Sequence, residues 1–185
     1  MTILVILVVI FAAVHALPAL PSVKGGLKAQ LGRAYGALYG VLSLILLVAI
    51  LWAYRKAPSD LVYDVPSWGR HANFGLTLLG FICLGIFLFR GSWRASLRYP
   101  MAIGVLLWAT GHLLANGDTR SIVFFGGLAL AALLQVFLMM QGGATAPADV
   151  RNGHNFLSVM AGIALYGLMT QLHYAVTGMP LVVLQ

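Results

Sequence analysis

Six apolar stretches of near membrane-spanning length run along this chain of 185 residues. They cover residues 3–20, 35–54, 74–89, 101–115, 122–140 and 156–175. A helix needs about 20 apolar residues to cross a hydrocarbon core about 30 Å thick, and the third and fourth stretches reach this length only with their flanks. None shows the period-two alternation of a barrel strand. Because only helices and closed barrels satisfy their backbone in lipid, the sequence predicts an all-α bundle of about six transmembrane helices in a single domain, residues 1–185.

The composition agrees with a chain whose main solvent is lipid. Hydrophobic residues make up 61% of the sequence and charged residues 8%, against about 25% charged in a typical soluble domain. The net charge of +7 comes from residues in short connections between apolar stretches. A lipid bilayer with an anionic surface is their expected partner, and no stretch resembles a nucleic-acid-binding element.

Charges in the connections predict the orientation in the membrane. The first, third and fifth connections carry seven basic residues: Lys24, Lys28, Arg33, Arg90, Arg94, Arg98 and Arg151. The second and fourth carry four: Arg55, Lys56, Arg70 and Arg120. The positive-inside rule places the richer set in the cytoplasm, so both termini are predicted on the outer side. The first stretch has no basic segment before it, which favours a retained helix over a cleaved signal.

Two histidines lie inside apolar stretches, His15 and His112. A charged side chain at such a position costs roughly 2.5–3.5 kcal/mol on insertion scales, so these residues usually face a partner, a cavity or a cofactor. Neutral imidazole is a common metal ligand, and two histidines on facing helices can hold a haem iron. The alternative is a structural hydrogen bond from each histidine to a neighbouring hydroxyl or backbone carbonyl.

The fourth apolar stretch places several distinctive side chains on one helix face. Gly104, Trp108, His112 and Asn116 recur every four residues, so a helix brings them into one stripe. In a cofactor-binding interpretation, Gly104 gives room for a flat ligand, Trp108 stacks on it, and His112 binds it. In a structural interpretation, the stripe packs against another helix.

Three further histidines lie near the ends of predicted helices. His154 begins the sixth helix and is an alternative metal-ligand partner for His112. His71 and His173 fall near the outer face. For all three, a hydrogen-bonded position in the membrane interface is the simpler interpretation, because amphipathic side chains favour that layer.

The chain resembles the NnrU family of integral membrane proteins over nearly its whole length. The matching segments are His15–Pro18 with Pro21 and Ser22, Leu31–Tyr35, Leu38 and Tyr39, Leu42–Leu44, Trp52–Tyr54, Ala57 and Pro58, Trp108 and Ala109, His112–Asp118, and Leu172 and His173 with Gly178. The most specific of these is the segment His112–Asp118 with Trp108.

This resemblance implies a multi-pass protein of the bacterial inner membrane, associated with nitrite and nitric oxide metabolism in denitrification. A related branch, the plant zeta-carotene isomerase, is a membrane enzyme that uses haem b held by histidines. By resemblance, His15 and His112 would be the haem ligands here, for redox or isomerase-type chemistry on nitric oxide or a small hydrophobic substrate. Trp108, Asn116 and Tyr35 would be pocket residues. The resemblance assigns no reaction.

One position departs from the family, and two other functions stay open. The family carries Arg–His–Pro before the fourth helix, where this chain has Arg98, Tyr99 and Pro100. A phenol of pKa about 10 cannot replace the proton or metal chemistry of a histidine. A membrane methyltransferase shares the Arg–His–Pro element, but this chain has no glutamate for the acidic site of those enzymes. A non-catalytic accessory protein of a nitrogen-oxide reductase needs only a packed bundle.

Overall fold

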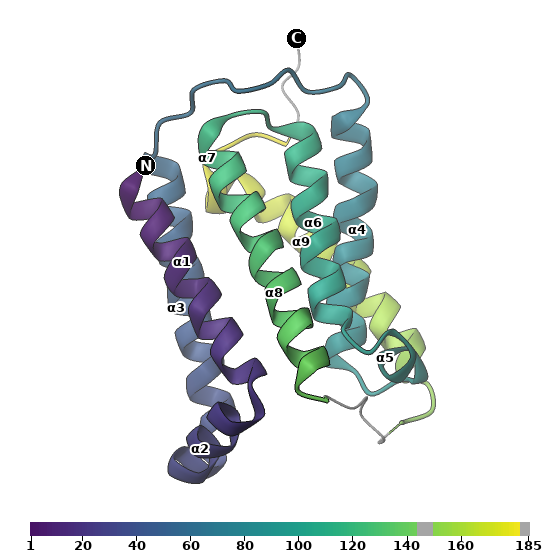
Figure 1. Ribbon diagram of the computed structural model, residues 1–185. Helices are drawn as coiled ribbons and strands as arrows, with labels where there is room; N and C mark the ends of the chain where they lie inside the picture. The colour runs from purple at the N-terminus through teal and green to yellow at the C-terminus, as the bar shows by residue number, and fades with distance from the viewer. Residues whose placement is uncertain (144–149, 182–185) are drawn as a thin grey trace. The chain divides into compact units, whose positions relative to one another are not determined.

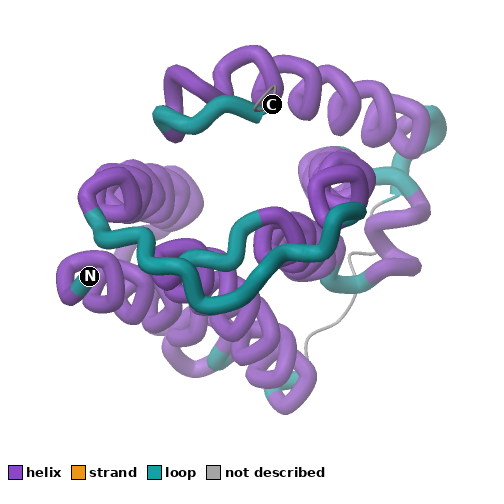
Figure 2. Tube along the Cα trace, turned by 90° about the horizontal axis from the view of Figure 1, so that it is seen from above, coloured by secondary structure: helices purple, strands orange, loops and turns teal. Residues whose placement is uncertain are grey.

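The computed structural model describes residues 1–143 and 150–181, and in this part of the chain the regular elements are helices (Figures 1 and 2). In chain order they are α1 (Thr2–Ala16), η1 (Leu17–Ala19), α2 (Pro21–Leu31), η2 (Gly32–Ala34), α3 (Tyr35–Lys56), α4 (Gly69–Leu88), α5 (Ser92–Leu97), α6 (Pro100–Ala115), α7 (Thr119–Ser121), a π-helical turn η3 (Ile122–Gly126), α8 (Gly127–Gln141) and α9 (His154–Thr177). The predicted all-α fold is confirmed. Asp149, in the fifth connection, lies outside the described residues.

Five helical segments are long and apolar enough to cross a membrane, and α6 is a shorter apolar helix. The long segments are Thr2–Ala19, Pro21–Lys56, Gly69–Leu88, Thr119–Gln141 and His154–Thr177. Large apolar side chains along them are widely exposed, as at Leu44 (61% exposed) and Leu130 (68% exposed). Such surfaces are costly in water and favourable in lipid, so the protein is a multi-pass membrane protein.

The chain forms two compact units, which are described separately. In the first unit, residues 1–63 and 117–143, α1 packs against both α3 and α8. Its core joins Leu4 of α1, Ile50 of α3 and Phe124 of the π-helical turn, all at most 2% exposed. Gly127 permits the close approach of α1, because a Cβ at this position would collide with Val8.

In the second unit, residues 64–116 and 150–181, α4 packs against α6 on one side and α9 on another. Glycines set both contacts. A Cβ added to Gly80 would lie 2.9 Å from the carbonyl oxygen of Gly104, and a Cβ on Gly104 would lie 2.8 Å from that of Gly80. A Cβ on Gly85 would collide with the backbone of Ser158. Small residues thus let helices associate closely, as is usual in membranes.

The first connection, between the apolar stretches 3–20 and 35–54, is largely helical. Helix α2 begins with Pro21 and ends at Leu31, and Gly32, whose φ is +53°, follows as its C-cap. Proline at the first position is pre-organised for a helix and lacks only an N–H that would be unpaired there. This favourable start compensates for Gly25 and Gly26, each of which destabilises a helix by about 1 kcal/mol relative to alanine. No residue of α2 is buried.

Candidate functional site

The stripe on α6 exists, and hydrogen bonds link its members. The ring Nδ1 of His112 lies 2.9 Å from the carbonyl oxygen of Trp108, one turn earlier. The side-chain Nδ2 of Asn116 donates to the carbonyl oxygen of His112 at 2.9 Å. The Trp108 and His112 rings lie side by side, with centroids 5.0 Å apart. The three side chains therefore form one continuous polar and aromatic face.

Gly104 does not give the stripe room for a flat ligand. It is buried, and the backbone of Gly80 fills the space where a Cβ would lie. The expectation of a ligand space at this position was wrong, because glycine here allows α4 to approach instead. The sequence pattern on α6 alone could not distinguish a space for a ligand from a space filled by a neighbouring helix.

The hydrogen bond of His112 fixes its tautomer. A backbone carbonyl can only accept, so Nδ1 carries the proton in this contact, and Nε2 carries the lone pair in the neutral ring. Histidines that bind metals commonly donate the other ring N–H to a carbonyl or carboxylate in this way. The ring orientation of His112 is therefore compatible with a metal bond through Nε2.

His15 in the first unit has the same arrangement. Its Nδ1 lies 2.9 Å from the carbonyl oxygen of Phe11, again one turn earlier. The Phe11 ring stacks on the imidazole at a centroid distance of 3.9 Å, and the Tyr39 ring lies 5.5 Å away. Tyr35, expected as a pocket residue, stacks on Tyr39 at 6.1 Å. His15 thus combines an Nε2 lone pair with an aromatic surrounding.

His154 is oriented in the opposite sense. Its Nδ1 accepts a hydrogen bond from the backbone N–H of Arg90 at 3.1 Å. In the neutral ring Nε2 then carries the proton, so both ring nitrogens differ from the pattern at His15 and His112. This contact favours a structural role for His154, in which it joins the end of α4 to the start of α9.

His173 lies on α9, in the same unit as the stripe. Its Nδ1 is 3.0 Å from the carbonyl oxygen of Met179, as expected for a hydrogen-bonded interfacial histidine. It is also near enough to His112 for the two rings to interact electrostatically. On α4, Asn73 lies against Gly111 of α6 and accepts a hydrogen bond from Thr77 at 2.9 Å. These polar neighbours were missed, because they come from other helices.

Asn116, Gly117 and Asp118, in the most specific motif of the sequence, each have a structural role. Asn116 bonds back to α6, and Gly117 lies so close to Tyr63 that a side chain would collide with its backbone. Asp118 caps the next helix by accepting from the N–H of Ser121 at 3.2 Å. The backbone N–H of Val62 donates to the carbonyl of Gly117 at 2.8 Å. Burial and then the charge of Asp118 raise the pKa of the Tyr63 phenol.

A polar network that the sequence did not predict lies beside this motif. The Tyr54 hydroxyl is 2.9 Å from the hydroxyl of Ser121, which donates to Asp118 at 2.7 Å. Arg120 pairs with Asp118 at 3.4 Å and places its guanidinium 5.0 Å from the centre of the Tyr54 ring. Ser121 is fully buried, so this network holds α3 to the start of the fifth apolar segment.

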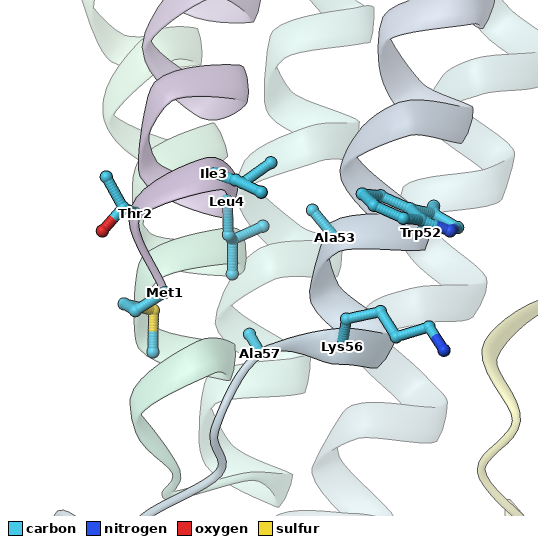
Figure 3. A pocket seen from close by; sticks show the side chains of 8 residues that line it. All are labelled: Met1, Thr2, Ile3, Leu4, Trp52, Ala53, Lys56 and Ala57. Carbon is cyan, nitrogen blue, oxygen red and sulfur yellow. The ribbon is translucent and has the colours of Figure 1, made fainter.

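A pocket of about 300 Å³ opens in the first unit, between the start of α1 and the end of α3 (Figure 3). Ile3, Leu4 and Ala53 supply apolar walls, while the amino group of Lys56 points away from them. His15 is eleven residues beyond Leu4, about 16 Å along α1, so this pocket does not include it. In the residues described, no group of three or more His, Cys, Asp and Glu side chains is placed to hold a metal ion.

The comparisons identify the family. A family model described as NnrU protein matches residues 3–181, which is nearly the whole chain. No curated protein and no solved structure matches it. Apart from Thr2 at the start of α1, the matched region includes the helices described above, and it includes both histidines that donate to their own helices. The chain therefore belongs to the NnrU family of membrane proteins.

Proposed function

We propose that this membrane protein binds haem b, which His15 and His112 would hold, and acts in nitrite and nitric oxide metabolism. The NnrU family is linked to denitrification gene clusters, which supports the pathway. Haem held by two histidines would supply one-electron redox chemistry, and loss of one histidine ligand would open the iron to nitric oxide or a small hydrophobic substrate. A reductase of the same pathway is the expected protein partner.

The observation that carries the proposal is the shared hydrogen bond of the two histidines. Each donates Nδ1–H to the carbonyl four residues earlier, at 2.9 Å in both cases. This bond holds the ring orientation and makes Nε2 more basic, as outer-shell carbonyls do for metal-bound histidines. Haem needs only one or two protein ligands, so a cluster of three ligating side chains is not required.

The neighbours of each histidine suit a flat, largely apolar ligand. At His112, the Trp108 ring offers a stacking surface and Asn116 holds the helix end through the His112 carbonyl. At His15, Phe11 and Tyr39 offer aromatic faces. These side chains exclude water and position the imidazoles, which is the contribution a protein makes to a haem site.

We place both termini on the periplasmic side of the bacterial inner membrane. The seven basic residues of the first, third and fifth connections support this orientation.

A reduced-minus-oxidised optical spectrum of the detergent-purified chain, with a pyridine haemochrome assay, tests the function. We expect a stoichiometric b-type signal that is lost or shifted in His15→Asn and in His112→Asn. Asparagine keeps a side-chain N–H donor near the Nδ1 position but removes the ring Nε2. His71→Asn is the matched control, because His71 is an exposed histidine of α4, and it should keep the wild-type spectrum.

A preparation that stays colourless after reconstitution with haem would overturn the haem proposal. Co-purification of a reductase subunit with such a colourless preparation would instead support the accessory function.

A further inference from the structure

One end of the second unit gathers arginines where three segments meet. Helix α4 ends at Leu88, α5 follows, and α9 begins at His154. The backbone N–H of Arg151 donates to the carbonyl of Arg90 at 2.7 Å, and the N–H of Arg90 donates to Nδ1 of His154. The backbones of Arg90 and Arg151 are thereby held side by side, although they are far apart in the sequence.

Asn155 fixes the start of α5 to the start of α9. Its Oδ1 accepts from the backbone N–H of Trp93 at 3.2 Å, and its Nδ2 donates to the Ser92 hydroxyl at 2.7 Å. Gly91 lies so close to Asn155 that a Cβ would collide with its side chain. These contacts hold this end of the unit in a defined conformation.

The charge of this surface is strongly positive. We call it the basic corner, formed by Arg90, Arg94, Arg98 and Arg151. Among the described residues of this unit the only acidic side chain is Asp64, which precedes α4 and so lies about 30 Å of helix from Arg90. The sequence adds Asp149, outside the described residues. Four arginines against one aspartate attract an anion.

From the ends of the membrane-length helices, we expect the basic corner at the depth of lipid headgroups. Both α4 and α9 are membrane-length apolar helices, and the corner begins just beyond their neighbouring ends. Within α5, Trp93 is 45% exposed and Leu97 is 38% exposed. An exposed tryptophan and leucine beside arginines are typical of a segment that lies in the membrane interface.

We propose that the basic corner binds the phosphate headgroup of an anionic phospholipid. Guanidinium groups match phosphate oxygens in geometry and charge. Trp93 and Leu97 then contact the upper part of the acyl chains. This site is separate from the histidines and does not depend on haem.

Titration of the detergent-purified full chain with phosphatidylglycerol or phosphatidylcholine, followed by thermal unfolding, tests this site. We expect phosphatidylglycerol, and not phosphatidylcholine, to raise the melting temperature, less so at high salt because of screening. In the double variant R90Q/R151Q the apparent affinity should fall on the order of tenfold or more, since one basic residue near an anionic surface accounts for about fivefold. The matched control R55Q/R70Q removes two exposed arginines outside the basic corner and should retain the wild-type response.

Circular dichroism checks that the variants fold, and R90K/R151K, which keeps both charges, should recover most of the preference. Equal responses to the two lipids, or equal losses in R90Q/R151Q and in the control, would overturn the proposal. Stabilisation by inorganic phosphate alone, with nothing added by phosphatidylglycerol, would assign the corner to a soluble anion and also overturn it.

Discussion

The Tyr99 hydroxyl is buried, and the described residues provide no hydrogen-bond partner for it. This tyrosine stands where the family carries histidine, and its hydroxyl makes no hydrogen bond within the described part of the chain. Its ring still contacts the Arg98 guanidinium, at 5.4 Å from the ring centre. The residue thus contributes an aromatic surface more than a polar group.

Replacing Tyr99 with phenylalanine should therefore stabilise the protein. The variant keeps the ring and the contact with Arg98, and removes a buried hydroxyl whose desolvation costs about 1–3 kcal/mol. We expect the free energy of unfolding to rise by about 1 kcal/mol, measured by thermal unfolding in detergent. A lower stability in Tyr99→Phe would show that the hydroxyl has a favourable partner.

Ser121 is the residue through which Tyr54 and Asp118 are joined. Ser121→Ala leaves the buried Tyr54 hydroxyl and the half-buried Asp118 carboxylate less satisfied, so it should cost about 1–3 kcal/mol of stability. Ser43→Ala is the control, because the Ser43 hydroxyl donates to the Tyr39 carbonyl within its own helix. Equal unfolding temperatures for the two alanine variants would contradict the role of the network.

Among the helices, the contact between α4 and α6 depends on the glycine pair Gly80 and Gly104. Gly80→Ala places a methyl group 2.9 Å from a backbone oxygen that cannot rotate away, so the helices must separate. We expect a loss of about 1–3 kcal/mol, as for overpacked cores. Gly75→Ala in the same helix meets no atom within 4 Å and should be neutral or stabilise by about 0.5–1 kcal/mol. Thermal unfolding of both variants checks this difference.

The sequence predicted the helices better than their contacts. The apolar stretches predicted the bounds of the long helices to within a few residues. For example, α3 was expected over residues 35–54 and is found as Tyr35–Lys56. The four-residue spacing on α6 correctly placed Trp108, His112 and Asn116 on one face. It could not show that Gly104 meets Gly80, because helix register is set by packing between distant segments.

The sequence also could not predict which ring nitrogen of each histidine carries the proton. His15, His112 and His154 are alike as residue types, yet the first two donate from Nδ1 and the third accepts there. That difference depends on which backbone group lies beside each ring, and it separates His15 and His112 from His154, although Nδ1 of His173 also lies against a carbonyl, that of Met179.

For the whole molecule, the main prediction is its orientation in the membrane, with both termini on the periplasmic side. A single cysteine placed at Ser59 should react with a membrane-impermeant maleimide in intact cells, and one placed at Asn152 should react only after permeabilisation. Both would be made in a Cys83→Ala background, since Cys83 is the one native cysteine. The reverse labelling pattern would place both termini in the cytoplasm.

The π-helical turn at Ile122–Gly126 bears on how relatives of this chain should be aligned. A π turn bonds residue i to i+5, so it uses one more residue per turn than the α-helix on either side. Removal of one residue from this turn would leave the number that an ordinary α turn uses, and Gly126, with open space where a Cβ would sit, has no side chain to lose. Ser121 would keep facing Tyr54, and Leu128 would keep its place in the core. A one-residue gap here in a related sequence would therefore mark a change of helical winding, and not a shortened loop.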